Sequence, residues 1–396
     1  MPNEDRAPQL RAIAGLSAAS FAVIGACLTL PGTLLPLLVK QFGMRLVEAG
    51  SMMAFQPVAY LLSVLVAAPL LHRFGMRAAL GASVLAFALG IAGFGLTSSW
   101  IAGAAMLFAS GLGFGLMEVA INTLLVGIGG ARSSNLLNFT HLFFGVGSFM
   151  APALTAQAVT AGLSWRIPFL VAGGVTALVA AGWGSLLSHD TTPASAASAS
   201  GGRAHSRLAV VLAVLLGLYV GTETGIGAWL TKYMVSARQV SLPYAGTTLS
   251  LYWLGLAAGR LVLSGVAHRI SEERLILGLT LFSSLALAGS VMAGNSWLAA
   301  LCFAGTGLGF SGIFPAVIAL GGRLHPHRTA AVTSILIAGA GIGGIVIPWT
   351  MSAIADGVGL VAGMSFYVAT AAAMVLLGAV IARATRADVQ SSRSGG

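Results

Sequence analysis

Long apolar runs separated by short polar segments dominate the hydrophobic pattern of this chain. About 20 mostly apolar residues are enough for a helix to cross a lipid bilayer, and the pattern predicts twelve such spans. The first six are expected at 11–39, 47–71, 77–97, 100–128, 134–160 and 165–187. The second six are expected at 207–235, 243–266, 273–293, 297–322, 329–353 and 357–383.

The segment 189–206 is rich in Ser, Ala and Gly, which is typical of a flexible linker, and it separates 1–188 from 207–396. The two halves repeat at a constant offset of 196 residues. Matches at this offset include Ala49-Gly50 with Ala245-Gly246, Gly111-Leu112-Gly113-Phe114 with Gly307-Leu308-Gly309-Phe310, Gly145 with Gly341, Gly147 with Gly343, and Pro152 with Pro348. Parallel repeats of this kind are typical of secondary transporters. We therefore predict an all-α membrane protein of two pseudo-symmetric six-helix bundles.

Composition supports a membrane protein, because 57% of the residues are hydrophobic and only 8% are charged. A soluble domain carries about a quarter charged residues. The net charge of +10 does not indicate nucleic-acid binding, because the basic residues lie singly in short loops. With the N-terminus inside, 15 of the 20 basic residues are cytoplasmic, and the outer five are Lys40, Arg45, Arg166, Lys232 and Arg238. We expect a multi-pass protein of the cell (inner) membrane with both termini in the cytoplasm.

Two carboxylates lie deep within predicted spans, Glu118 and Glu223. A charged group at that depth costs at least a few kcal/mol on insertion scales, so it usually faces a wet cavity or a partner. Because burial disfavours the ionised form, either carboxylate is a candidate proton-coupling group. The alternative for Glu118 is a structural hydrogen bond to a neighbouring helix. Glu223 is instead a structural acid if Thr222, Thr224 or a neighbouring helix holds it.

Further polar and aromatic side chains are candidates for solute binding. Asn122 lies one turn after Glu118, and Asn138 shares a helix face with His141. The alternative for His141 is a hydrogen-bonded tie between helices. Trp229 and Tyr252 could stack on a sugar ring, although Trp and Tyr also populate membrane interfaces.

The loop after the second predicted span carries a family resemblance. It reads Ala68-Pro69-Leu70-Leu71-His72-Arg73-Phe74-Gly75-Met76-Arg77, and it resembles the pattern Gly-x-Leu-x-Asp-Arg-x-Gly-Arg of the major facilitator superfamily. Arg73, Gly75 and Arg77 match this pattern, whereas His72 and Ala68 stand where the family has Asp and Gly. The resemblance implies twelve helices in two bundles. It also implies a cytoplasmic gate near Arg73, Gly75 and Arg77, to which we add Arg260 as the matching basic residue of the second half.

A narrower resemblance is to the fucose–proton symporter branch of that superfamily. The matching segments are Gly111 to Glu118 with Asn122, Asn138 to Gly145, Tyr219 to Leu230, and Gly259-Arg260. In that branch the acid that corresponds to Glu118 is linked to proton coupling. The fucose permease also has an acid in its first span, but 21–39 contains none here, so either coupling is simpler or Glu223 supplies the second carboxylate.

Enzymatic function is not expected. The only lysines are Lys40 and Lys232, so there is no Gly-x-x-x-x-Gly-Lys phosphate loop, and no nucleophile motif or metal cluster is evident. We expect a monomeric, proton-coupled secondary transporter without a cofactor, which moves a small sugar-like solute by alternating access. The alternatives are a proton-antiport exporter of drugs or metabolites and a transporter-like sensor.

Overall fold

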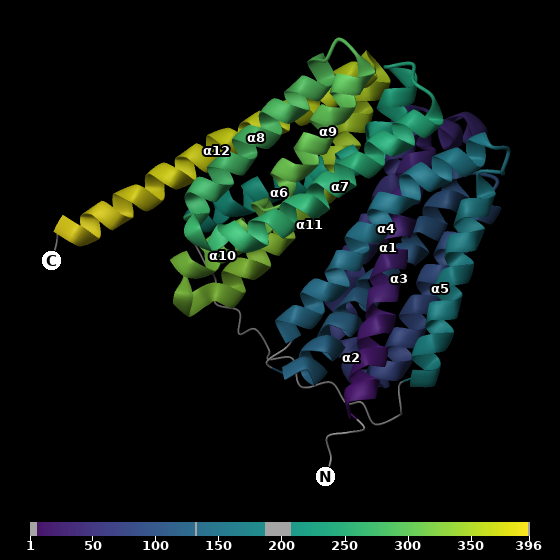
Figure 1. Ribbon diagram of the computed structural model, residues 1–396, viewed down its shortest axis with the longest axis horizontal. Coiled ribbons are helices and arrows are strands. Elements are labelled where there is room, and N and C mark those ends of the chain that lie inside the picture. Colours follow the sequence, from purple (N-terminus) through teal and green to yellow (C-terminus); the bar gives the residue numbers. More distant parts are fainter. Residues whose placement is uncertain (1–5, 131–132, 187–206, 395–396) are drawn as a thin grey trace. The chain divides into compact units, whose positions relative to one another are not determined.

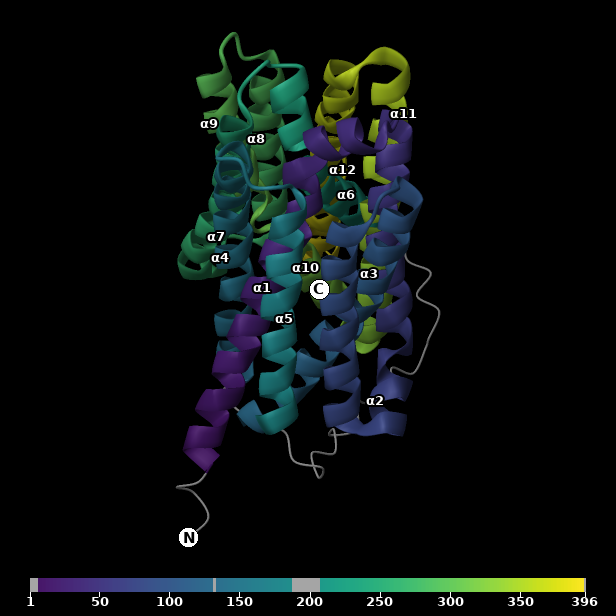
Figure 2. The same cartoon turned by 90° about the vertical axis from the view of Figure 1, so that its right-hand side faces the viewer.

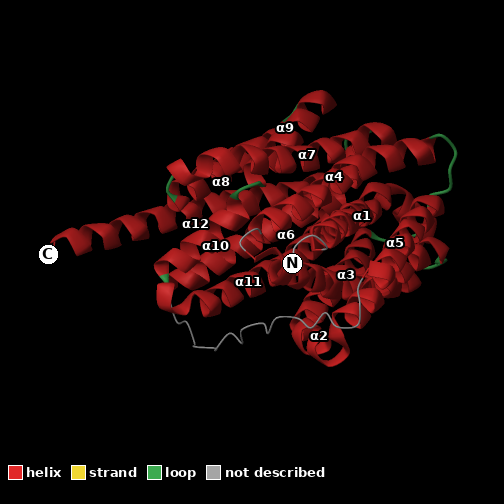
Figure 3. Ribbon diagram, turned by 60° about the horizontal axis from the view of Figure 1, so that its bottom comes forward, coloured by secondary structure: helices red, strands yellow, loops and turns green. Residues whose placement is uncertain are grey.

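The computed structural model describes residues 6–130, 133–186 and 207–394, and Figure 3 shows that these residues form helices and loops without a strand. The chain divides into two compact units, Met1–Ala197 and Ser198–Gly396. The segment 189–206, which we expect to be a linker, lies outside the described residues. Each unit is described separately below.

The first unit contains five helices, drawn from purple to teal in Figure 1. Their bounds are α1 Arg6–Phe42, α2 Leu46–Leu96, α3 Trp100–Gly129, α4 Ser133–Thr160 and α5 Arg166–Leu186. Helix α2 packs against α3 and α5, while α1 packs against α4 and α5. Figure 2 shows α2 and α3 running side by side, and this pair contains the candidate site of the first unit.

Helix α2 consists of two antiparallel arms that meet at Gly75. Gly75 has φ 77° and ψ 161°, which is a non-helical conformation available to glycine. The two arms pack beside neighbouring positions of α3: Gly111 lies against the Gln56 carbonyl, and Gly113 lies against Phe87. In a straight helix Gln56 and Phe87 would be about 46 Å apart, so the chain must reverse direction at Gly75. The arms correspond to the spans expected at 47–71 and 77–97.

The second unit contains seven α-helices and two short 3₁₀ helices among its described residues. Their bounds are α6 Arg207–Ser236, α7 Leu242–Val266, η2 Ala267–Arg269, α8 Glu272–Met292, α9 Ser296–Phe310, α10 Ile313–Leu324, η3 Pro326–Arg328, α11 Thr329–Val358 and α12 Leu360–Ser394. Helix α6 packs against α11 and α12, α7 packs against α9, and α8 packs against α9 and α12.

The span expected at 297–322 is confirmed as an apolar segment of spanning length, but its helix is interrupted. The structure divides it into α9 and α10 at Ser311 and Gly312. Pro315 has no backbone N–H to donate to the Ser311 carbonyl, so the helical hydrogen-bond ladder is interrupted at this point. Taken together, α9 and α10 still form one apolar segment of spanning length. Over the described residues, eleven helical segments are long and apolar enough to cross a membrane, with α2 counted once.

The sequence repeat corresponds to repeated helix contacts within the units. A Cβ atom on Gly111 would collide with the Gln56 carbonyl, and one on Gly307 would collide with the Tyr252 carbonyl. Gly147 presses in the same way against α1, at Ala22, and its counterpart Gly343 presses against α6, at Gly217. The glycines of the repeat are therefore positions where two helix backbones approach too closely for any side chain, as is common in membrane helices.

Candidate functional site

The candidate site of the first unit is a hydrogen-bonded pair, Tyr60 and Glu118. The Tyr60 hydroxyl, on the first arm of α2, donates to the Glu118 carboxylate on α3. The Glu118 side chain is half-buried on α3. Helix α3 is one of the helices that are long and apolar enough to cross a membrane. An intramembrane carboxylate held by a neutral donor has no formal counter-charge in that contact, so a bound proton would remove its desolvation cost.

The glycine-rich stretch before Glu118 brings Tyr60 into position. A Cβ atom on Gly115 would lie 2.7 Å from the Tyr60 carbonyl oxygen, so only glycine allows the first arm of α2 to approach here. The Tyr60 ring stacks on Phe114, with ring centroids 4.6 Å apart and planes inclined by 30°. The backbone contact and the ring contact together fix the direction of the Tyr60 hydroxyl.

Asn122 lies one helical turn after Glu118. Its amide oxygen Oδ1 is buried and has no hydrogen-bond partner among the described residues. A buried acceptor without a donor costs about 1–3 kcal/mol, so it favours any molecule that can donate to it. Glu118 and Asn122 are therefore two acceptors spaced by one turn of α3.

The structure places the other two candidates of the first unit on α4. The His141 ring lies edge-on to Phe21 of α1, with centroids 4.5 Å apart and planes inclined by 62°. Asn138 is exposed near the beginning of α4. His141 thus belongs to the contact between α1 and α4, whereas Glu118 belongs to the contact between α2 and α3.

The second unit contains a larger polar cluster around Glu223. The Glu223 carboxylate and the Tyr219 hydroxyl are hydrogen-bonded, and Tyr219 is also hydrogen-bonded to the guanidinium of Arg260. Arg260 interacts electrostatically with Glu223. The Tyr252 hydroxyl donates to the Glu223 backbone carbonyl at 3.0 Å. The cluster therefore joins α6 and α7 through one carboxylate, one guanidinium and two phenols.

Two packing contacts hold Arg260 and Tyr219 at this cluster. Gly259 packs so closely on Ser311 that a Cβ atom would collide with its hydroxyl, which fixes α7 beside the end of α9. Phe310 of α9 meets the Tyr219 ring edge-on, with centroids 5.5 Å apart. The sequence predicts Arg260 as a gate residue, and in the structure its guanidinium is hydrogen-bonded to Tyr219, the neighbour of Glu223.

The two aromatic candidates are covered in this conformation. Trp229 and Tyr252 are both 0% exposed. The Tyr252 ring also meets Trp253, with centroids 5.3 Å apart. Stacking of either ring on a solute would therefore require a different arrangement of α6 and α7. In the described conformation Tyr252 instead orients the backbone at Glu223.

The residues that match the loop pattern lie around the turn of α2. Arg73 is exposed, and its guanidinium lies 5.4 Å from the centre of the Phe74 ring. Arg77 donates from Nη2 to the Gly184 carbonyl at 2.8 Å, near the end of α5. The basic residues of this loop thus contact a ring and a helix-end carbonyl, while a role in gating stays a prediction.

Tyr60 and Tyr219 are the residues of the two clusters that sequence reasoning did not identify. Tyr219 precedes Glu223 by one turn on the same helix, and this spacing could have identified it. Tyr60 comes from a different span, so its partnership with Glu118 depends on how the arms of α2 fold.

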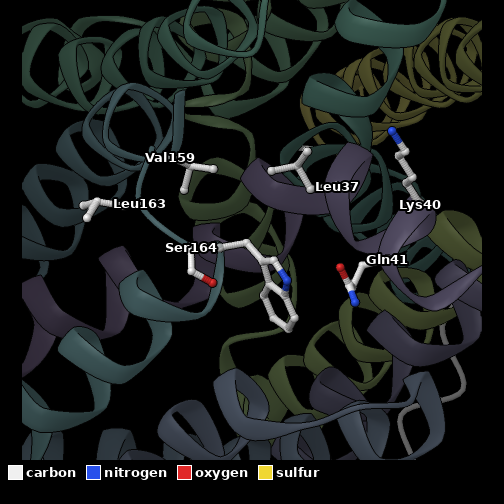
Figure 4. Close-up of a pocket in the computed structure, with 7 residues that line it drawn as sticks. Leu37, Lys40, Gln41, Val159, Leu163 and Ser164 are labelled. Carbon is white, nitrogen blue, oxygen red and sulfur yellow. The ribbon is translucent and has the colours of Figure 1, made fainter. Parts of the chain in front are cut away.

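A cavity of about 490 Å³ lies in the first unit. Figure 4 shows three of its polar side chains, Lys40 and Gln41 from α1 and Ser164 from the loop after α4, and Trp165 also lines it. Its apolar lining comes from Leu37, Val159 and Leu163. It is formed by the last turns of α1 and α4 and the loop that follows α4, so it shares no lining residue with the Tyr60–Glu118 pair.

Comparisons with known proteins agree with this architecture. The chain is 24% identical over 349 residues to the glucose/mannose transporter GlcP of Bacillus subtilis (strain 168), covering 83% of this chain and 84% of that protein. The crystal structure of the nucleoside transporter NupG superposes with a TM-score of 0.77 at 11% identity, over 95% of this chain and 99% of NupG.

The structure of the E. coli fucose:proton symporter FucP superposes with a TM-score of 0.62 at 17% identity, over 93% of this chain and 98% of FucP. At these identities the two structural matches establish the fold alone. The family model of the Major Facilitator Superfamily matches residues 17–274. The chain therefore belongs to the major facilitator superfamily and is a membrane transporter, not an enzyme.

Proposed function

We propose that this transporter couples the movement of a small, sugar-like solute to the movement of protons, with Glu118 as the proton site. The observation that carries the proposal is the Tyr60–Glu118 hydrogen bond, made within a membrane span by a carboxylate and a neutral donor. Asn122 adds a buried acceptor, Oδ1, which has no partner among the described residues. A solute hydroxyl is a suitable donor for that acceptor.

Named relatives and structural neighbours support the class of solute. GlcP is named as a glucose/mannose transporter and FucP as a fucose:proton symporter. We extend sugar-like specificity and proton symport to this chain on that basis, together with the polar side chains of the site. Asn138 and His141 are proposed as further solute contacts, because they lie on α4 beside α1.

The chemistry of coupling follows from desolvation. An ionised Glu118 makes a closed, dry cavity unfavourable, whereas protonation removes the charge. The solute-loaded protein would change its access from one side of the membrane to the other only with a neutral Glu118, and the empty protein would return after releasing that proton on the other side. Tyr60 would hold the carboxyl in one orientation in both charge states, because a phenol can donate to a carboxylate and accept from a carboxylic acid.

The membrane topology belongs to the same proposal. The two arms of α2 would cross the bilayer separately, which gives twelve crossings in two bundles of six. The bundles are proposed as 1–188 and 207–396, joined by a cytoplasmic linker at 189–206. The basic residues would place both termini in the cytoplasm of a monomer in the inner membrane.

Uptake into proteoliposomes tests the proposal. Wild-type protein should accumulate a neutral hexose such as glucose when an inward proton gradient is imposed. Glu118→Gln keeps the shape of the side chain and mimics its neutral form, so it should abolish accumulation while exchange of internal for external solute continues. Glu48→Gln is the matched control, because Glu48 accepts from the Arg45 backbone at the beginning of α2 and an amide oxygen can replace it there.

Two outcomes would contradict the proposal. Full gradient-driven accumulation by the Glu118→Gln protein would leave Glu118 as a packing residue. Accumulation of cationic drugs but not of hexoses by inverted vesicles would favour the exporter instead.

A further inference from the structure

Arg260 is unusual because it is a permanent charge within a membrane helix. Six residues separate it from the end of α7 at Val266, which corresponds to about 9 Å along the helix axis. A basic residue in a span costs several kcal/mol unless it has a partner, and such residues usually pair with acids or line a wet cavity. The partner that the structure gives Arg260 is the Tyr219–Glu223 pair.

The geometry of this cluster is built by two phenols. The Tyr219 hydroxyl can accept from the Arg260 guanidinium and donate to the Glu223 carboxylate, so it bridges the two charges. The Tyr252 hydroxyl fixes the backbone of Glu223 through its 3.0 Å hydrogen bond. Tyr219 and Tyr252 are 1% and 0% exposed, whereas Arg260 is exposed. The guanidinium is thus the accessible part of a cluster whose supporting side chains are covered.

Glu118 and Glu223, the two carboxylates deep within the predicted spans, therefore differ in their partners. Glu118 is hydrogen-bonded by the neutral Tyr60, whereas Glu223 is next to the positive Arg260. Arg260 can compensate the charge of an ionised Glu223, so the two side chains together carry no net charge. The function of Glu223 should therefore follow from the hydrogen-bond donors and acceptors that Glu223 and Arg260 present together.

We propose that Glu223 and Arg260 form a paired solute-binding site that selects neutral, polyhydroxylated solutes over carboxylates and amines. The guanidinium supplies several N–H donors and the carboxylate supplies acceptors, and each hydroxyl of a sugar can both donate and accept. The net charge of the pair is zero, so a charged solute would leave one charge of the site uncompensated. This inference rests on the proposed function, and it changes the expected role of Arg260 from gating to solute binding.

Exchange kinetics in proteoliposomes test the inference with glucose, glucuronate and glucosamine as probes. Wild-type protein should prefer glucose. Arg260→Gln should raise the half-saturating glucose concentration by about tenfold or more, because a charged hydrogen-bond donor is lost. Arg269→Gln removes an exposed charge of η2 and should leave that concentration unchanged. Arg260→Lys keeps the positive charge, so the protein should fold, but it should still raise the half-saturating glucose concentration.

The double variant Glu223→Gln/Arg260→Gln separates solute binding from a purely structural ion pair. Removing both charges should restore thermal stability relative to either single variant, while glucose affinity stays reduced. A double variant with wild-type half-saturation would overturn the inference and leave the pair structural. A change in maximal rate alone in Arg260→Gln would also overturn it, in favour of a gate.

The failure of this inference is distinguishable from the failure of the proposed function. Wild-type protein that exchanges glucose while Arg260→Gln has an unchanged half-saturation would refute only the paired site. Wild-type protein that exchanges glucuronate in preference to glucose would refute the selection of neutral solutes. Wild-type protein that exchanges none of the three probes would refute the sugar-like function and the paired site together.

Discussion

At the scale of single residues, Glu118 and Glu223 are each hydrogen-bonded to a tyrosine. The tyrosine lies on a neighbouring helix for Glu118 and one turn earlier on the same helix for Glu223. Tyr60 reaches Glu118 from α2, and Tyr219 reaches Glu223 from within α6. The difference between them is Arg260, which contacts only the second pair. On this difference rests our proposal that Glu118 exchanges a proton and that Glu223 binds the solute.

Tyr60→Phe tests the first pair. The change removes the hydroxyl and keeps the ring that stacks on Phe114, so packing should survive. Loss of a hydrogen bond to a charged group is worth about 1.5–3 kcal/mol, and we expect gradient-driven accumulation to fall about tenfold or more. Accumulation in proteoliposomes measures this change.

Tyr244→Phe is the control for that substitution. The Tyr244 hydroxyl is buried and has no hydrogen-bond partner among the described residues, so its removal should cost nothing. Equal losses of accumulation in Tyr60→Phe and Tyr244→Phe would show that the Tyr60 hydroxyl has no special role in coupling.

The sequence identifies both carboxylates, since an acid in an apolar span is visible without a structure. It does not reveal Tyr60, because the partner lies on another span and depends on close packing at Gly115. The sequence predicts Arg260 as a gate residue because it matches the basic residues that follow the second span, and its contact with Tyr219 is not visible without the structure. The Arg260 side chain is long enough for its guanidinium to reach Tyr219 from the second half of α7.

At the scale of helices, glycine determines where the chain turns and where helices touch. Gly75 reverses α2, and the glycines of the 196-residue repeat mark close contacts in both units. The hydrophobic pattern predicts nearly all the spans, including the two arms of α2 on either side of Gly75. It does not predict the break between α9 and α10, because hydrophobicity continues through Ser311 and Gly312 while the backbone hydrogen bonding does not.

Gly75→Ala should destabilise the turn of α2. A Cβ atom at Gly75 meets no atom within 4 Å, so the cost comes from the positive φ of 77° and amounts to about 1–2 kcal/mol. Gly81→Ala is the matched control, because Gly81 is helical and its Cβ would also meet no atom within 4 Å. Alanine there should be neutral or stabilising. Thermal unfolding in detergent measures both, and equal midpoints would contradict this account of Gly75.

Arg73→Ala and Arg77→Ala test the predicted gate at the same turn. Arg77→Ala loses the 2.8 Å hydrogen bond to the Gly184 carbonyl, which ties the turn of α2 to α5. Either change should alter the balance of inward and outward states more than solute affinity, so maximal rates should change while half-saturation does not. Unchanged transport kinetics in both variants would count against a gating role.

At the scale of the whole molecule, membership of the major facilitator superfamily accounts for the helical repeat and the membrane composition. Within this framework the first unit holds a carboxylate with a neutral partner, and the second unit holds a charged pair. The proposal assigns proton coupling to the first unit and solute selection to the second. Coupling between them then requires that the protonation of Glu118 changes the population of states that bind solute.

The sign of solute-induced proton movement tests this account most directly. Proteoliposomes in weakly buffered medium, without an imposed pH gradient, would receive external glucose, and the external pH would be recorded. Symport through Glu118 predicts that the medium becomes more alkaline as protons enter with glucose, and that Glu118→Gln abolishes the signal. Acidification of the medium, or glucose entry without any change of pH, would contradict proton symport.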